Sequence, residues 1–125
     1  MYKIVIATPR KDAFRAFGDA LETAGRDIRL TWVRSGADAL NAATDSVPDL
    51  IVVDDPLEDT DGVRLIRQLL GVNAMINTAL VSPLSGEDFH ESTEGLGILN
   101  NLPPDPDESD AHALLASLVE IVGSK

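Results

Sequence analysis

The sequence predicts an α/β protein built on a doubly wound parallel sheet. Apolar segments with the spacing of strands alternate with amphipathic segments with the spacing of helices along the whole chain. The segment 49–54 is apolar on both faces, which is typical of a strand in the middle of a parallel sheet. Strict alternation favours parallel strands joined by crossover helices, so we expect five strands covered by helices on both faces, in three layers.

Five short apolar segments bounded by polar or turn residues are the expected strands. They are Tyr2–Ala7, Ile28–Val33, Asp49–Asp54, Asn77–Ser82 and Gly97–Asn101. Helices are expected between and after them, at Asp12–Ala24, from the cap residue Ser35 onward, at Asp61–Leu70, at Gly86–Glu94 and at Asp110–Val122. The segment 103–107 contains three prolines and is expected to be a loop, because proline lacks the N–H that a helix or strand needs.

Length and composition limit the possible classes of protein. With 125 residues, the chain is expected to form a single domain over residues 1–125. The absence of cysteine excludes disulfides and thiolate metal sites. No apolar run approaches the roughly 20 residues of a membrane span, and the first residues have a strand pattern rather than that of a signal peptide. A cytoplasmic location is therefore expected.

The formal net charge of −11 is unevenly distributed. Residues 1–44 contain seven Lys/Arg and five Asp/Glu, whereas residues 45–125 contain three Lys/Arg and sixteen Asp/Glu. An acidic surface repels phosphate backbones and anionic lipids, so nucleic acids and membranes are not expected as direct partners. Two interpretations stay open, namely an acidic surface that keeps the protein soluble and a surface that binds a basic protein.

Asp54 ends the third expected strand and is the main candidate functional residue. In parallel α/β sheets the functional site lies beyond the carboxyl ends of the strands. A carboxylate in that place can attack phosphorus and form an acyl phosphate. Because both reactants are anions, such a transfer depends on a metal ion and a cation that neutralise the transition state.

Four stretches, by their order and spacing, resemble the receiver domain of bacterial two-component response regulators. They are Lys3–Ile6, Ser35–Leu40, Pro48–Asp54 and Asp61–Leu69, and the similarity covers residues 3–82. The resemblance implies a flavodoxin-like (CheY-like) fold with the strand order 2-1-3-4-5. It also implies that a histidine kinase phosphorylates Asp54, with Mg²⁺ held by this aspartate and two acids after the first strand, and with a lysine after the fifth strand.

The chain departs from the receiver pattern at most of the positions that the resemblance assigns. Thr8 and Pro9 stand in place of the acid pair, Leu102 in place of the lysine and Leu99 in place of the switch aromatic. Ser82 is a candidate for the switch hydroxyl, although an ordinary turn serine explains it better. Mg²⁺ needs oxygen ligands, usually carboxylates, so we expect no bound metal or other cofactor, and no cation near Asp54.

We therefore expect a degenerate receiver that acts as a protein-interaction module in phosphorelay signalling, with impaired Mg²⁺-dependent phosphotransfer and no enzymatic activity. The alternative is a working phosphoacceptor in which a histidine kinase phosphorylates Asp54 and a partner supplies the missing charges. A flavodoxin-like enzyme or cofactor binder is the third hypothesis. It is disfavoured because the loop 8–11 lacks the glycine of a phosphate cradle, and because His90 and His112 lie on expected helices far from Asp54.

The charge distribution also bears on self-association and on signalling partners. Residues 72–124 contain nine acids and no Lys or Arg, which disfavours a symmetric dimer across the fourth and fifth helices. Arg10, Lys11 and Arg15 could instead contact an acidic surface of a second copy head to tail. We expect either a monomer or weak non-symmetric association, with a histidine kinase or a basic protein as the signalling partner.

The acidic residues that follow the third strand are interpreted as a solvated loop. The spacing of a calcium-binding loop fails here, because Leu57 stands at its first position. Asp55 is not expected to replace the missing acids, because alternation along a strand points it away from Asp54.

Overall fold

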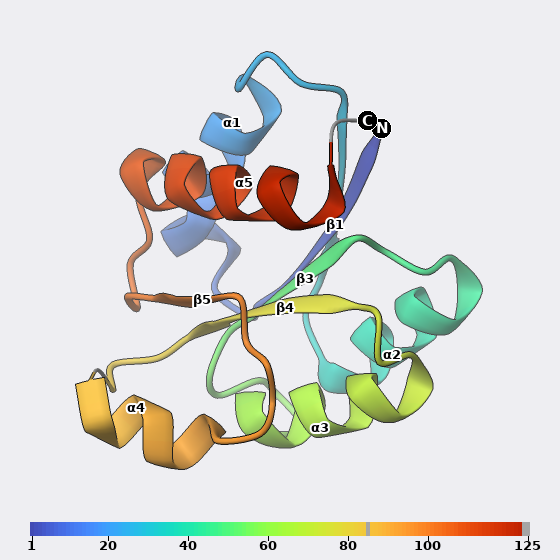
Figure 1. Cartoon of the computed structure of the whole chain (residues 1–125), viewed down its shortest axis with the longest axis vertical. Helices are drawn as coiled ribbons and strands as arrows, with labels where there is room; N and C mark the ends of the chain where they lie inside the picture. Colours follow the sequence, from blue (N-terminus) through green and yellow to red (C-terminus); the bar gives the residue numbers. More distant parts are fainter. Residues whose placement is uncertain (85, 124–125) are drawn as a thin grey trace.

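The computed structural model describes residues 1–84 and 86–123, and within them the chain forms one sheet between two layers of helices (Figure 1). Five parallel strands pair in the order β2-β1-β3-β4-β5. The fold class and the strand order expected from the sequence are both confirmed. The strands are β1 (Tyr2–Ala7), β2 (Ile28–Val33), β3 (Leu50–Val53), β4 (Asn77–Val81) and β5 (Asn100–Leu102).

The helices are distributed over both faces of the sheet. Helices α1 and α5 pack against each other on one face, whereas α2 and α3 pack together on the other face, which α4 also covers (Figure 1). A short 3₁₀ helix, η1, precedes α1. The helices are η1 (Lys11–Phe14), α1 (Arg15–Glu22), α2 (Gly36–Asp45), α3 (Gly62–Val72), α4 (Gly86–Thr93) and α5 (Glu108–Val122).

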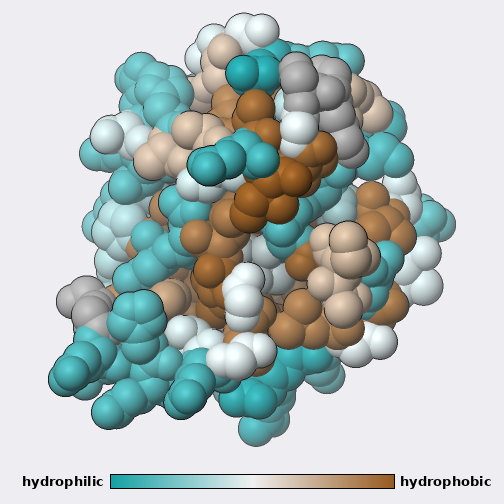
Figure 2. Space-filling model, viewed as in Figure 1, coloured by the Kyte–Doolittle hydropathy of each residue, from teal (hydrophilic) through white to brown (hydrophobic). Residues whose placement is uncertain are grey.

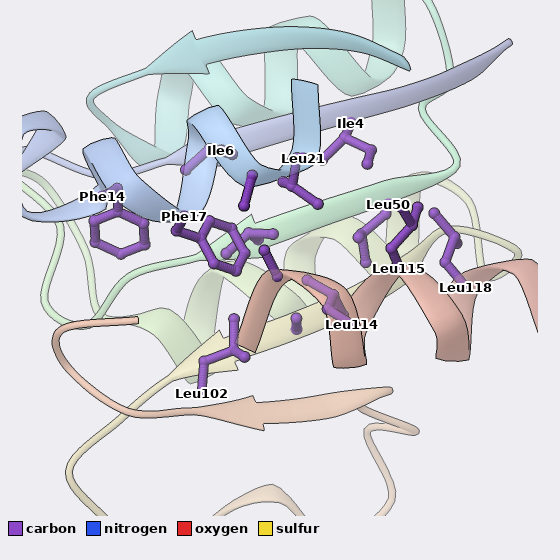
Figure 3. Close-up of a cluster of buried hydrophobic side chains, with 14 of the residues drawn as sticks. Ile4, Ile6, Phe14, Phe17, Leu21, Leu50, Leu102, Leu114, Leu115 and Leu118 are labelled. Carbon is purple, nitrogen blue, oxygen red and sulfur yellow. The ribbon is translucent and has the colours of Figure 1, made fainter. Parts of the chain in front are cut away.

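The central strand β3 is buried on both faces and separates two apolar cores. Leu50 and Val52 pack with side chains of α1 and α5 in the core that Figure 3 shows, whereas Ile51 and Val53 pack with side chains of α2 and α3. Burial of an aliphatic side chain of this size contributes roughly 1.5–3 kcal/mol. Packing from both sides therefore fixes the strand up to the residue before Asp54.

Most of the differences from the expected element boundaries are of one or two residues, and those of the first helix, β5 and α5 have a local physical reason. The first helix starts as the 3₁₀ turn η1 and its α-helical part ends at Glu22, because the chain then turns toward Gly25, which has a φ of 79°. Strand β5 does not begin at Gly97, because the φ of 61° at this residue is not extended. Helix α5 begins at Glu108, since Asp107 and Asp110 form a capping box.

Two expected helix starts are confirmed by their caps. The Ser35 hydroxyl accepts a hydrogen bond from the Asp38 amide at 3.1 Å at the start of α2. The Asp61 carboxylate accepts one from the Arg64 amide at 2.8 Å at the start of α3. Each cap satisfies a backbone donor that the first helical turn leaves free. The loop between β3 and α3 is thus fixed at its far end by Asp61.

The view in Figure 2 combines a hydrophilic surface over α4 with hydrophobic side chains along the middle of the same face. The exposed residues of α4 include Glu87, Asp88 and Glu91, in agreement with the acidic composition of this part of the chain. Within the described residues, no helix combines the length and the apolar character that a bilayer crossing requires.

Candidate functional site at the carboxyl end of β3

The fold brings the residues that follow β1 and β3 to the same edge of the sheet. Strands β1 and β3 run parallel, with Ala7 beside Val53. The Asp54 amide then donates to the Ala7 carbonyl at 2.9 Å, which extends the pairing by one bond. Thr8 and Asp54 therefore lie next to each other, and the Asp54 side chain has no exposed surface.

Both carboxylate oxygens of Asp54 are occupied by hydrogen-bond donors. Oδ2 accepts from Thr8 Oγ1 at 2.7 Å and from Arg10 Nε at 2.9 Å. Oδ1 accepts from Arg10 Nη2 at 2.9 Å and from the Asp55 amide at 2.8 Å. Four donors directed at one carboxyl group, two of them from a guanidinium, fit an ionised carboxylate, which is an acceptor only.

Arg10 forms a bidentate ion pair with Asp54 and also contacts the loop that follows β5. Its Nη2 donates to the Pro104 carbonyl at 2.9 Å, and its Nη1 lies 3.8 Å from Asp105 Oδ1. The guanidinium carbon lies 5.6 Å from the centre of the Phe14 ring, a cation–π distance. The hydrogen bond to Asp54 is the main cause that raises the pKa of Arg10 above its ordinary value.

Thr8 links the loop after β1 to the same carboxylate. Its hydroxyl donates to Asp54 and accepts from the Arg10 amide at 2.9 Å, so one buried side chain orders the backbone that carries the arginine. Pro9, between them, is half-buried. The positions that the receiver resemblance assigns to an acid pair thus hold a hydroxyl group and a proline ring next to a guanidinium.

The expectation that no cation lies near Asp54 is wrong. Arg10 supplies one from the loop after β1, because its side chain is long enough to fold back over the end of the neighbouring strand β3. A basic residue shortly after the first strand was the signal that could have revealed this pair. Arg10, which the sequence suggested for contact with a second copy, is paired with Asp54 within the chain.

The residues at the ends of β4 and β5 have a different role. The Ser82 hydroxyl is buried and accepts from the Leu84 amide at 3.1 Å, which is the bond of a serine turn. Leu102 ends β5 beside Val81 and is only 2% exposed, packed in the apolar core beside α5 (Figure 3). Leu99 is half-buried against the same core. None of these three side chains has a recorded bond to Asp54 in the described part of the chain.

The acids that follow Asp54 are each bonded to a separate group. Asp55 Oδ1 accepts from the Gly62 amide at 3.0 Å, and Glu58 pairs with Arg34 at 3.0 Å. Asp59 accepts from the amides of Gly36 and Ala37 at the start of α2, and these bonds lower its pKa. Over residues 1–84 and 86–123, no three acidic, histidine or cysteine side chains are grouped as metal ligands.

A Mg²⁺ ion does not fit the donors around Asp54. Such an ion is usually held by one or two carboxylates together with water and substrate oxygens. Here the place beside the carboxylate is taken by the Arg10 guanidinium, and a divalent cation next to it would be repelled.

Gly62 brings α3 close to the carboxyl end of β3. A Cβ atom at this position would lie 2.6 Å from Leu80 Cδ1 and 3.2 Å from the Asp54 carbonyl oxygen. A larger residue would therefore require the Leu80 side chain or the start of α3 to shift. The Asp61-Gly62 pair thus combines a helix cap with a close helix–strand contact.

Comparison with solved structures identifies the fold. A two-component response regulator from Clostridium difficile superposes with a TM-score of 0.83 and 18% identity, over 99% of this chain and 100% of that chain. A CheY-like response regulator receiver domain protein from Methanospirillum hungatei JF-1 gives 0.79 and 14%, over 96% and 95% of the two chains. The Mn²⁺-bound form of response regulator Rcp1 gives 0.75 and 18%, over 98% and 94%.

No protein-family model and no curated protein matches the chain in sequence. The resemblance to receiver domains is nevertheless confirmed in three dimensions, over nearly the full length of both this chain and the receiver structures. The chain has the CheY-like fold of response regulator receiver domains.

Proposed function

We propose that this protein is a degenerate receiver that works in phosphorelay signalling by binding other proteins, and that its Mg²⁺-dependent phosphotransfer is impaired. One observation carries the proposal: both oxygens of the candidate phosphoacceptor Asp54 are occupied by donors of the same chain, chiefly Arg10. The receiver fold supports the signalling class.

The closed carboxylate is a poor nucleophile for a physical reason. A phosphoryl donor can reach Asp54 only if Arg10 leaves, because the carboxylate has no exposed surface. Removal of one partner from a buried ion pair costs roughly 3–5 kcal/mol. Since the Arg10 side chain is 40% exposed, the lower end applies, and about 3 kcal/mol reduces the open population by roughly a hundredfold.

The alternative function, a phosphoacceptor modified on Asp54, is favoured by the same arginine. The groups around Asp54 include one cation, and a guanidinium that swings outward can bind the oxygens of a phosphoryl group in the bidentate way that it binds a carboxylate. In this alternative Arg10 would take over part of the charge neutralisation that the absent lysine and acid pair would provide.

Intact-mass measurement after incubation with acetyl phosphate, with and without Mg²⁺, tests the proposal. We expect no adduct in either condition, while a receiver with a complete acid pair and lysine, treated in parallel, is phosphorylated. A metal-dependent adduct that disappears in Asp54→Asn would overturn the proposal. A metal-independent adduct with the same dependence on Asp54 would instead support the alternative.

Partners, cofactors and domain organisation follow the same proposal. We propose a single domain without a bound cofactor and without a catalytic residue of its own. We propose that the acidic surface of α4, where Glu87, Asp88 and Glu91 are exposed, binds a basic surface on a signalling protein. A histidine kinase is one such protein. The chain itself is proposed to be monomeric or to associate weakly without symmetry.

A further inference from the structure

We propose that Arg10 is a latch that couples the state of Asp54 to the position of the loop between β5 and α5, residues 103–107. The inference rests on the proposed function in one respect, which is that Asp54 is unphosphorylated in the resting protein. It adds a mechanism by which a change at this residue would reach a distant surface loop.

One nitrogen atom carries the coupling. Arg10 Nη2 donates both to Asp54 Oδ1 and to the Pro104 carbonyl, at 2.9 Å in each case. The described structure records no direct bond between Asp54 and the loop, so the guanidinium is the connection between them. Asp105, 3.8 Å from Arg10 Nη1, adds an electrostatic attraction from the same loop.

The loop is held firmly at both ends, so the latch acts on a short segment. At one end, Leu102 is buried and its carbonyl accepts from the Ser82 amide at 3.0 Å. At the other end, Asp107 caps α5. Three prolines lie in the segment 103–106 and restrict its backbone further. Loss of the Pro104 contact therefore releases a defined stretch rather than the whole helix.

The arginine is itself held in place independently of the loop. Its amide donates to Thr8 Oγ1, and its guanidinium lies over the Phe14 ring. The two hydrogen bonds from the guanidinium to Asp54 then fix the direction in which Nη2 points. Neutralisation or modification of the carboxylate removes the main attraction on the guanidinium. Arg10 Nη2 is then no longer held in place, and its hydrogen bond to the Pro104 carbonyl weakens.

Coupling between two sites is reciprocal. A partner protein that binds the loop in its present position also holds Arg10 on Asp54, and so keeps the carboxylate closed. A partner that pulls the loop outward makes Asp54 more accessible. The same ion pair thereby links binding at a surface loop to reactivity at a buried acid.

Hydrogen exchange with mass spectrometry tests the latch through a double-mutant cycle of Arg10→Gln and Asp54→Asn. The readout is the exchange rate of the amides of Asp105 and of residues 107–110, since the prolines of the loop carry no N–H. It is compared with the rate in peptides of β4, which report global opening. We expect Asp54→Asn to speed exchange in the loop by about 5-fold to 150-fold, the range of ordinary coupling energies. In the Arg10→Gln background the same substitution should add less than about twofold.

The control is Arg15→Gln, which removes a nearby exposed arginine that pairs only with Asp12 in the described structure. It should leave loop exchange unchanged.

An Asp54→Asn effect of equal size in both backgrounds, or no effect beyond that in β4, would overturn the latch. If the single variants are too unstable, Arg10→Lys replaces Arg10→Gln, because lysine keeps the charge but cannot bridge both acceptors with a rigid fork. The acetyl phosphate assay remains a separate readout, so failure of the latch and failure of the proposed function are distinguishable.

Discussion

The carboxyl edge of the sheet has two halves with opposite character. After β1 and β3, Thr8, Arg10 and Asp54 form a closed polar cluster with charges of both signs. After β4 and β5, Ser82 closes a turn and Leu102 packs into the apolar core. The same backbone architecture therefore carries a charged network on one side and ordinary turn and core packing on the other.

This difference shows that a buried acid can be neutralised from one half of the edge alone. A buried carboxylate needs a counter-charge close by, because an unpaired buried charge is costly. Arg10 provides it from the half that keeps Asp54. In the other half, Leu102 contributes to the apolar core instead.

The largest expected effect comes from placing a lysine in the apolar half. Leu102→Lys should destabilise the protein by about 3–5 kcal/mol, because it removes a core side chain and buries an ammonium group. Urea denaturation measures the loss, and Leu102→Met, with similar volume, should cost less than about 1.5 kcal/mol. If Leu102→Lys has nearly wild-type stability, the ammonium group leaves the core for solvent or for Asp54, and the two halves differ less in character.

A second, smaller effect is expected from removal of the arginine in the polar half. Arg10→Ala should cost about 2–3 kcal/mol, less than for a fully buried pair, because water can enter where the half-exposed guanidinium was. Chemical denaturation measures this change. The double variant Arg10→Ala with Asp54→Asn should be more stable than Arg10→Ala alone, since no buried charge is then left unpaired. An equally unstable double variant would mean that Arg10 acts through packing on Phe14 instead.

The smallest expected effect concerns acid sensitivity in the loop that follows β3. Amide donors at Gly36 and Ala37 lower the pKa of Asp59 below its ordinary value of 3.8. The ionised Asp59 therefore contributes to the free energy of unfolding at neutral pH. This contribution is lost as the pH falls through the lowered pKa of Asp59 in the folded protein. Asp59→Asn should be less stable than wild type at neutral pH, and the difference in stability between the two proteins should become smaller below pH 3.8. Urea denaturation midpoints measure this difference. A gap that is constant with pH would exclude this ionic contribution.

Local patterns predicted the fold well because each element is specified by nearby residues. The bounds of β1 and β2 are as expected, and the Ser35 and Asp61 caps follow from side chains placed next to the first turn. The β5 boundary was missed, because the apolar pattern around Ile98 does not reveal the positive φ of Gly97.

The candidate site was predicted less completely. The burial of Asp54 at the end of β3 follows from the apolar run before it. Its pairing with Arg10 does not, because the two residues are 44 positions apart and no periodicity connects them. Only the register between β1 and β3 brings the two loops together, and register depends on the assembled sheet.

The hydrogen bonds that lead to Asp54 run in one direction. The Arg10 amide donates to the Thr8 oxygen, and the Thr8 proton points on to the carboxylate. Neither step can be reversed while the acid is ionised, because an amide cannot accept and a carboxylate cannot donate. A single negative charge thus sets the direction of the side-chain hydrogen bonds in the first loop, and a neutral group in its place would remove that preference.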